Sequence, residues 1–336
     1  MTQSLITTDL DFTAEGRQTG FLRVPHSHHA SAYGWIALPV VCLKNGDGPT
    51  MLLMAGNHGD EYEGQIALAR LARALSADDI RGRLIILSTV NAPAAEAGLR
   101  TSPIDGGNLN RTFPGKARGT PTQMIAHYLE TVLMPLADYA IDLHSGGTSL
   151  FYPATLLRGP AHSPEEADLL TKMQTAFDLP YTWIFTGGGG RGSTAPTAMG
   201  AANRNGVVSV MAELGGGGVV TPDILHLAER GLRRVLHALG MLPGYQPDAP
   251  RGTRALNAVG LVHAYDSGVL ELLKDIGDDV AENDTVAVIH HPDTPWKTPE
   301  KLRSSHAGIV LCKRALGPVK RGDAVFQIAK DVRGST

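Results

Sequence analysis

Cysteine is scarce in this chain of 336 residues. There are only two cysteines, Cys42 and Cys312, far apart and outside any CxxC spacing. Disulfide frameworks and thiolate metal sites both need several cysteines at short spacings. The sequence therefore excludes both kinds of site, and we expect a reducing, cytoplasmic setting.

An excess of charge of either sign is missing too. The formal net charge is −3, with 43% hydrophobic and 19% charged residues. Proteins that bind nucleic acids or anionic membrane surfaces concentrate Lys and Arg in patches or tails. We expect neither of these partners, and a small molecule is the expected ligand.

Long hydrophobic runs are also lacking. No uninterrupted apolar stretch approaches the roughly 18 residues of a spanning helix. The first residues, MTQSLITTDLDF, have neither the basic start nor the apolar stretch of a signal peptide. We therefore expect a protein that is neither exported nor embedded in a membrane.

Short apolar stretches alternate with helical segments over the first 245 residues. Strands are expected at Trp35–Leu43, Thr50–Ala55, Leu84–Val90, Tyr139–Leu143 and Val207–Ala212. Helices are expected at Glu61–Leu75, Thr122–Leu136, Pro164–Phe177 and Pro222–Leu239. This alternation predicts one α/β domain, residues 1–245, with a mixed, largely parallel sheet covered by helices.

After a linker at residues 244–252, the pattern changes to short strands and turns. Two stretches that begin at Gly268 and Gly308 form a weak internal repeat. They predict a small C-terminal β domain, residues 253–332, as a β-sandwich that resembles the biotinyl/lipoyl-type fold. Carriers of that type hold their lysine on a tight hairpin, whereas the connection around Lys297 is long and contains proline. A carrier role is therefore not expected.

Histidine and glutamate follow three of the expected strands. His58 and Glu61 lie in GNHGDEYEG, His144 in IDLHSGG and Glu213 in MAELGGGG. Ligands gather beyond the carboxyl ends of strands in open α/β sheets. We therefore expect these four side chains to meet at one edge of the sheet.

Two imidazoles and one carboxylate form a known catalytic zinc set, which leaves a fourth position open. We interpret His58, Glu61 and His144 as ligands of one Zn²⁺ per subunit. Zinc lowers the pKa of bound water to about 7, and a free carboxylate nearby can take the proton. Glu213 is the candidate base. The same ligands would also accept cobalt or manganese, and any one of these residues alone would be an ordinary polar residue.

The stretch NAPAAEAGLRTSPIDGGNLNRTFPG follows another expected strand and supplies candidates for the substrate end. Arg111 has a planar fork that suits a carboxylate, with Asn110 beside it. Arg100 is the candidate for stabilising the oxyanion of a tetrahedral intermediate. The alternative for each arginine is a solvated charge on a loop, without a role in binding or catalysis.

The ordered motifs GNHGDEYEG, GGNLNRTFPG, IDLHSGG and MAELGGGG resemble the succinylglutamate desuccinylase/aspartoacylase family, a branch of the zinc carboxypeptidase-like fold. The resemblance covers nearly the whole chain. It implies hydrolysis of the amide of an N-acyl amino acid. It also implies zinc ligands at His58, Glu61 and His144, a general base at Glu213, a carboxylate clamp at Asn110 and Arg111, and a carbonyl-polarising Arg100.

Within the family, the motifs most resemble deacetylases that act on N-α-acetyl-L-2,4-diaminobutyrate in ectoine degradation, which implies acetate and diaminobutyrate as products. Asp105 is a candidate partner for a cationic substrate side chain, with a turn-forming role as its alternative. A succinylated substrate would instead need a further cation, for which Arg191 in TGGGGRGS is the candidate.

Other functions remain open from the sequence. They are a succinylglutamate desuccinylase or aspartoacylase-type deacylase, a zinc carboxypeptidase acting on peptides, and a non-catalytic metal or carrier module. No motif specifies the oligomeric state, so a homo-oligomer paired through the β domain is an open arrangement.

Overall fold

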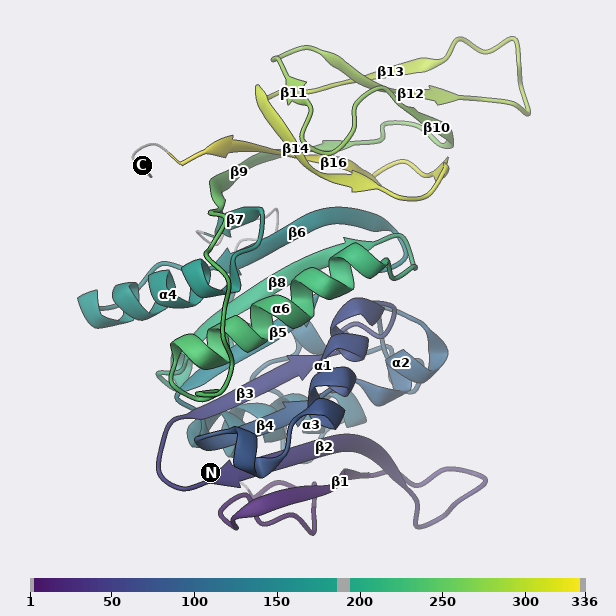
Figure 1. Cartoon of the computed structure of the whole chain (residues 1–336). Coiled ribbons are helices and arrows are strands. Elements are labelled where there is room, and N and C mark those ends of the chain that lie inside the picture. Colours follow the sequence, from purple (N-terminus) through teal and green to yellow (C-terminus); the bar gives the residue numbers. More distant parts are fainter. Residues whose placement is uncertain (1–2, 186–193, 333–336) are drawn as a thin grey trace.

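A twelve-stranded mixed sheet runs through the computed structural model, which describes residues 3–185 and 194–332 (Figure 1). Eight of its strands precede the linker: β1 (Gly16–Pro25), β2 (Trp35–Asn45), β3 (Thr50–Ala55), β4 (Gly82–Leu87), β5 (Tyr139–His144), β6 (Leu150–Arg158), β7 (Tyr181–Ile184) and β8 (Val208–Gly216). Their order is β1-β2-β4-β3-β5-β8-β6-β7. Strands β4, β3, β5 and β8 are parallel neighbours, whereas β1, β2 and β6 pair with antiparallel neighbours. The expectation of a mixed α/β sheet is confirmed.

Helices cover both faces of this sheet. They are α1 (Tyr62–Ala74), α2 (Ala92–Ala97), α3 (Pro121–Tyr128), α4 (Pro164–Phe177), α5 (Ala198–Arg204) and α6 (Pro222–Ala238). Apolar residues of α1, α4 and α6 pack on one face together with Leu53 of β3, and those of α3 and α5 pack on the other with Leu52. Every residue of β3 is buried. Burial on both faces explains why this strand is an unbroken apolar run rather than an alternating one.

The sequence missed several elements. The strand β6 contains Pro153, and its pairing with β8 is irregular between Tyr152 and Thr155. Proline inside a run argues against a strand and is tolerated at such bulges. The strand β7 and the helices α2 and α5 are short. The expected helix at 122–136 is confirmed only in part, because α3 continues as a π turn (Leu129–Leu133) and a 3-10 turn (Met134–Leu136).

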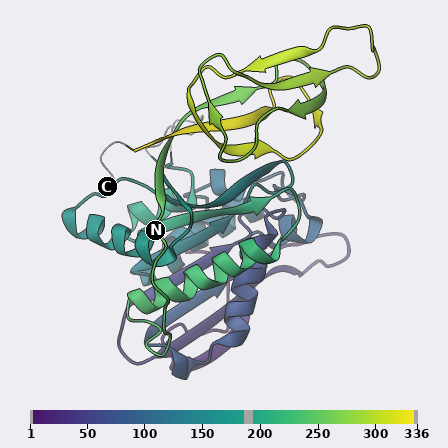
Figure 2. The same cartoon turned by 45° about the horizontal axis from the view of Figure 1, so that its top comes forward.

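The C-terminal strands form two packed sheets. They are β9 (Arg254–His263), β10 (Gly268–Leu272), β11 (Asp279–Val280), β12 (Thr285–His290), β13 (Glu300–Arg303), β14 (Gly308–Arg314), β15 (Pro318–Val319) and β16 (Ala324–Asp331). Strands β9, β16, β14 and β11 extend the long sheet, and β13, β12, β10 and β15 form a second one above it (Figure 2). Their facing side chains, among them Val286 and Phe326, share one apolar core. The likeness of this sandwich to the biotinyl/lipoyl-type fold stays a prediction.

The C-terminal strands are joined to the rest of the sheet by hydrogen bonds. Strand β9 pairs with β7 in parallel, and β14 pairs with β6 through Lys313 opposite Phe151. The C-terminal strands therefore lie directly beside β6 (Figure 1). With the predicted domain limits, 1–245 and 253–332, these strand pairings are contacts between the two predicted domains. Within the described ranges, none of the helices is long and apolar enough to cross a membrane.

A buried ion pair fixes α4 and α6 to the linker. Asp178 ends α4 in a left-handed conformation (φ 56°). Its carboxylate accepts hydrogen bonds from Arg230 Nη2 of α6 at 2.8 Å and from the backbone nitrogens of Arg251 and Gly252 at 2.8 and 3.0 Å. Burial opposes the charge, but these bonds, with those of Arg251 first, hold the pKa of Asp178 below its ordinary 3.8.

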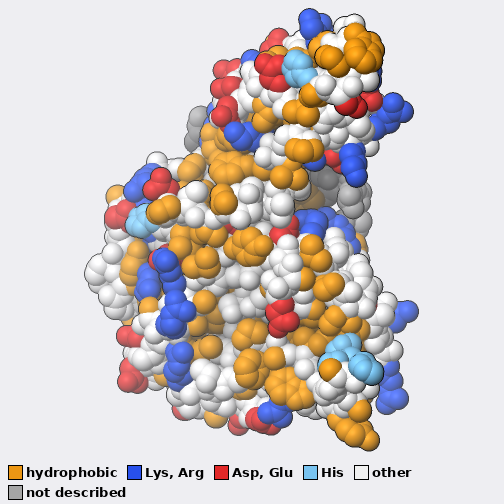
Figure 3. Space-filling model, turned by 90° about the vertical axis from the view of Figure 1, so that its right-hand side faces the viewer, with side chains coloured by type: hydrophobic (Ala, Val, Ile, Leu, Met, Phe, Trp, Pro, Cys, Tyr) orange, Lys and Arg blue, Asp and Glu red, His pale blue; other side chains and the backbone are white. Residues whose placement is uncertain are grey.

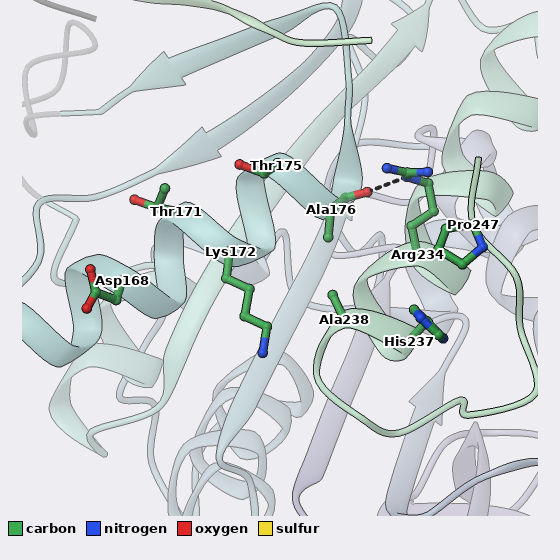
Figure 4. Close-up of a pocket in the computed structure, with 9 residues that line it drawn as sticks. All are labelled: Asp168, Thr171, Lys172, Thr175, Ala176, Arg234, His237, Ala238 and Pro247. Atoms are coloured by element: carbon green, nitrogen blue, oxygen red, sulfur yellow. Dashed lines mark hydrogen bonds between the residues drawn. The ribbon is translucent and has the colours of Figure 1, made fainter. Parts of the chain in front are cut away.

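A hollow of about 450 Å³ lies beside this pair, between α4 and α6 (Figure 4). Arg234 lines it, but its guanidinium is already used. Its Nε donates to the carbonyl oxygen of Ala176 at 2.8 Å and its Nη1 to Asp248 at 2.9 Å. The hollow is a packing feature of the two helices.

We predict that Asp178→Asn lowers the free energy of unfolding by about 2 kcal/mol at pH 7, because the buried guanidinium of Arg230 loses the buried one of its two charged acceptors and keeps only Asp248. Since the pKa of Asp178 is depressed in the folded state, its contribution is present above the ordinary carboxyl pKa and is lost as the pH falls through the folded value. Urea titrations at pH 7 and pH 3 measure the difference. Asp168→Asn, on the exposed side of the same helix, is the control. Equal stability of Asp178→Asn and wild type at pH 7 would contradict the assignment.

Candidate active site

Three neighbouring parallel strands end side by side and deliver the four predicted residues. In the register, Ala55 of β3 lies opposite Leu143 of β5, and His144 lies opposite Glu213 of β8. His58 and Glu61 follow β3 in the turn that leads into α1. On the side of the molecule where these strands end, basic, acidic and hydrophobic side chains are interspersed (Figure 3). The expectation that the strand ends meet at one edge is confirmed.

The turn after β3 packs tightly under α2. A Cβ atom on Gly59 would lie 2.0 Å from the backbone of Ala94. Only glycine fits this approach, which explains one of the glycines in GNHGDEYEG. The contact fixes the turn between His58 and Glu61.

The Glu61 carboxylate lies between the two imidazoles. Its Oε1 is 2.7 Å from His58 Nδ1, and its Oε2 is 2.8 Å from His144 Nδ1. All three side chains are buried, with 2–3% of each residue exposed. Their ligand atoms all lie within 4.8 Å of one another, so the group could hold a metal ion.

The far edges of both rings face oxygen atoms. His58 Nε2 is 3.2 Å from the amide oxygen of Asn108, and His144 Nε2 is 2.8 Å from Asp142 Oδ2. Asp142 is itself held by the amide nitrogen of Asn57, at 3.0 and 2.8 Å from its two oxygens. Because these oxygens accept, we infer that each Nε2 carries a hydrogen. The two Nδ1 lone pairs then face the carboxylate.

Three electron-pair donors therefore surround one point, and a positive charge at that point would stabilise them. The pKa of Glu61 is lowered: burial alone would raise it, but His58 and His144 outweigh burial. The pKa of His144 is raised well above its ordinary value because Asp142 and Glu61 outweigh burial. Protons or a metal cation satisfy such a site, and outer-shell carboxylates like that of Asp142 are typical supports of metal-binding imidazoles.

Glu213 is separate from this group of three. Burial, followed by the negative charge of Glu61, raises the pKa of Glu213 to about 8. Its Oε2 is buried and has no hydrogen-bond partner within the part of the chain that the structure describes. A carboxyl group of this kind can exchange a proton near neutral pH.

The loop after β4 brings two of its three predicted residues to the cluster. Arg100 Nη1 donates to Glu61 Oε1 at 3.3 Å, while its side chain stays 48% exposed. Asn110 is buried. Its amide nitrogen lies 3.4 Å from His144 Nε2, and its oxygen accepts from the backbone nitrogen of Ala198 at 2.9 Å. Arg111 is exposed, and its Nη1 donates to the carbonyl oxygen of Asn110 at 2.6 Å.

The two candidates for substrate selectivity have different outcomes. Asp105 accepts hydrogen bonds from the backbone nitrogen of Gly107 and from the backbone and hydroxyl of Thr122, at 2.8–3.0 Å. These are the bonds of a turn-forming aspartate that ties the loop to α3, the alternative that the sequence left open. Arg191 lies outside the described residues.

Asn57 and Asn108 were missed from the sequence. Each supports a partner far along the chain, Asp142 and His58 respectively. Asparagine has no spacing rule that marks such a role. The only signal was position, since Asn57 directly precedes His58 and Asn108 lies in GGNLNR.

Known proteins resemble this chain over nearly its whole length. It is 38% identical over 332 residues, 98% of this chain and 96% of the relative, to the N-alpha-acetyl-L-2,4-diaminobutyric acid deacetylase of Halomonas elongata. A product-bound structure of the ectoine utilization protein EutE from Ruegeria pomeroyi matches with a TM-score of 0.91 and 37% identity, covering 98% of this chain and 100% of that one.

A structure from Rhodobacter sphaeroides, described as succinylglutamate desuccinylase/aspartoacylase, matches with a TM-score of 0.90 and 35% identity, covering 98% of this chain and 100% of that one. Residues 47–239 match the model of the succinylglutamate desuccinylase/aspartoacylase catalytic domain, the segment that carries every residue of the cluster. The chain belongs to the succinylglutamate desuccinylase/aspartoacylase family.

Proposed function

We propose that this protein is a zinc-dependent amidohydrolase that removes the acyl group from an N-acyl amino acid, with N-α-acetyl-L-2,4-diaminobutyrate as the substrate. The observation that carries the proposal is the convergence of His58, Glu61 and His144 next to a separate carboxyl group, Glu213. The similarity to the Halomonas elongata deacetylase supports the choice of substrate.

His58, Glu61 and His144 fit a zinc ion, because two Nδ1 lone pairs and a carboxylate face one another with their outer edges already supported. When bound there, zinc would supply Lewis acidity toward the acyl carbonyl and would lower the pKa of a water molecule. The chain's own side chains carry out the remaining steps.

Glu213 is the proposed general base. Burial strengthens its carboxylate as a base, which suits it to accept a proton from the attacking water and return it to the departing amine. Among the described residues its Oε2 has no hydrogen-bond partner, which leaves an oxygen available for that contact. Because it lies opposite His144 in the register, the base is held beside the proposed metal ligands by the sheet itself.

Arg100 and the Asn110–Arg111 pair are proposed to hold the substrate. Arg100 reaches Glu61 with a half-exposed guanidinium, which leaves donors for the carbonyl oxygen of the substrate. Arg111 is exposed next to Asn110, so its guanidinium is accessible to a substrate carboxylate. The amide oxygen of Asn110 accepts from the backbone nitrogen of Ala198, and its backbone carbonyl accepts from Arg111, so Asn110 also keeps Arg111 and α5 in place.

A deacylase of the succinylglutamate or aspartoacylase type is the second candidate, because the Rhodobacter sphaeroides structure carries that description at 35% identity. An anionic acyl group would need a cation at the acyl end of the site. The two candidates differ only in substrate, so one set of assays separates them.

The test is amine release from N-α-acetyl-L-2,4-diaminobutyrate, N-acetylaspartate and N-succinylglutamate, each measured before chelator treatment, after it, and after zinc is restored. We expect zinc-dependent release from the acetyl-diaminobutyrate. Release from one of the other two would replace the substrate and keep the chemistry. The absence of zinc-dependent release from all three would overturn the proposal.

We predict that Glu213→Gln lowers kcat at least about 100-fold while zinc content stays at the wild-type level, since the amide cannot accept the proton. Glu229→Gln on α6, whose partner is Arg70, is the matched control and should keep full activity. Near-normal turnover by Glu213→Gln would show that another group is the base.

We predict that Asp142→Asn weakens zinc binding about 10- to 100-fold, because it removes the charged acceptor that fixes the His144 ring. Competition with a chromophoric chelator gives the affinity. Asp223→Asn, in the exposed first turn of α6, is the control. An unchanged affinity would mean that Asp142 serves the fold alone.

A further inference from the structure

Tyr152 lies on β6, the strand that pairs with β8 beside the proposed base. Glu213 of β8 pairs with His144 of β5 on one side and with Thr155 of β6 on the other, and Tyr152 pairs with Gly215 after an irregularity in the register. Neighbouring strands lie about 4.8 Å apart. Tyr152 therefore stands one strand away from Glu213 and two residues along the register.

Two buried residues of the C-terminal strands hold this phenol. Its hydroxyl donates to Gln327 Oε1 of β16 at 3.4 Å and also has a hydrogen bond with the Cys312 thiol of β14. Gln327 and Cys312 are only 5% and 2% exposed. The pairing of Lys313 with Phe151 fixes β14 directly beside Tyr152. These contacts link the C-terminal strands to the edge of the site.

Charged groups of the proposed site shift the pKa of the Tyr152 hydroxyl. Burial raises its pKa well above the ordinary value, the Cys312 thiol and the Glu213 carboxylate raise it further, and the Arg100 guanidinium lowers it. The phenol is therefore a proton-bearing donor within the field of both groups. Its bond to Gln327 is long compared with the usual 2.7–2.8 Å of an O–H···O bond, so a better placed acceptor would compete for it.

We propose that the Tyr152 hydroxyl donates a hydrogen bond to an oxygen of the bound N-acyl amino acid, and that Gln327 is a positioning residue that orients the phenol from β16. This inference rests on the proposed function and extends it, since it makes the C-terminal strands part of the substrate site. Gln327 itself does not contact the substrate in this account.

The first test is Tyr152→Phe, with kcat and KM measured on the acyl amino acid that the wild type hydrolyses best. We expect kcat/KM to fall about 10- to 100-fold, the range for one hydrogen bond to a charged oxygen. Zinc content and thermal midpoint should match the wild type. Tyr181→Phe, a half-buried tyrosine of β7 in the same sheet, is the matched control. A kcat/KM within twofold of wild type in Tyr152→Phe would overturn the substrate contact.

The second test is a double-mutant cycle with Gln327→Met, which keeps the length of the side chain and removes its polar atoms. If Gln327 acts through Tyr152, the single variant lowers kcat/KM, and adding it to Tyr152→Phe causes little further loss. Fully additive losses would contradict the positioning role, because a general structural effect does not depend on the phenol hydroxyl. Thermal midpoints of all four proteins show whether packing has changed.

Failure of the proposed function would be recognised separately. A wild-type protein that releases amine normally, with an unaffected Tyr152→Phe variant, overturns only the role of Tyr152. A wild type that neither hydrolyses any of the acyl amino acids nor binds diaminobutyrate or acetate by calorimetry overturns both proposals.

Discussion

The site depends on one electrostatic constraint: a buried carboxylate faces the Nδ1 atoms of two buried imidazoles. Glu61 lies 2.7 and 2.8 Å from the Nδ1 atoms of His58 and His144. Such a group is unfavourable without positive charge between its members. The surrounding residues maintain the constraint, since Asn108 and Asp142 occupy the outer nitrogen of each ring. The proposed base, Glu213, is held beside this group because it lies opposite His144 in the register, and its own burial raises the pKa of its carboxyl.

The sheet makes this arrangement rigid. Parallel pairing of β3, β5 and β8 brings their carboxyl ends together, so residues more than eighty positions apart meet without long flexible connections. Strand β6 pairs antiparallel with β8, and β14 pairs with β6 at the junction with the C-terminal strands. The C-terminal strands are thus hydrogen-bonded to the strand beside Glu213, which gives them a structural route to influence the substrate.

The sequence predicted the parts of the fold that have strong periodic or apolar patterns. The expected strand at Thr50–Ala55 is present and is fully buried, and the strand ends meet as predicted. The remaining strand and side-chain contacts depend on residues far apart in the sequence. Pro153 concealed β6, because its tolerance depends on a bulge opposite β8. Asp105 could not be assigned before its bonds to Thr122 were seen. The outer support of His58 comes from Asn108, fifty residues away, and no local pattern encodes such a contact.

The most direct test of the account is the zinc content of the purified chain, by mass spectrometry of the metal after equilibrium dialysis against buffered zinc. The account predicts one zinc ion per wild-type chain and almost none in Glu61→Ala, because that variant removes the carboxylate between the two imidazoles. A wild-type chain without zinc, or a Glu61→Ala chain that keeps a full equivalent, would contradict the assignment of this cluster as the metal site.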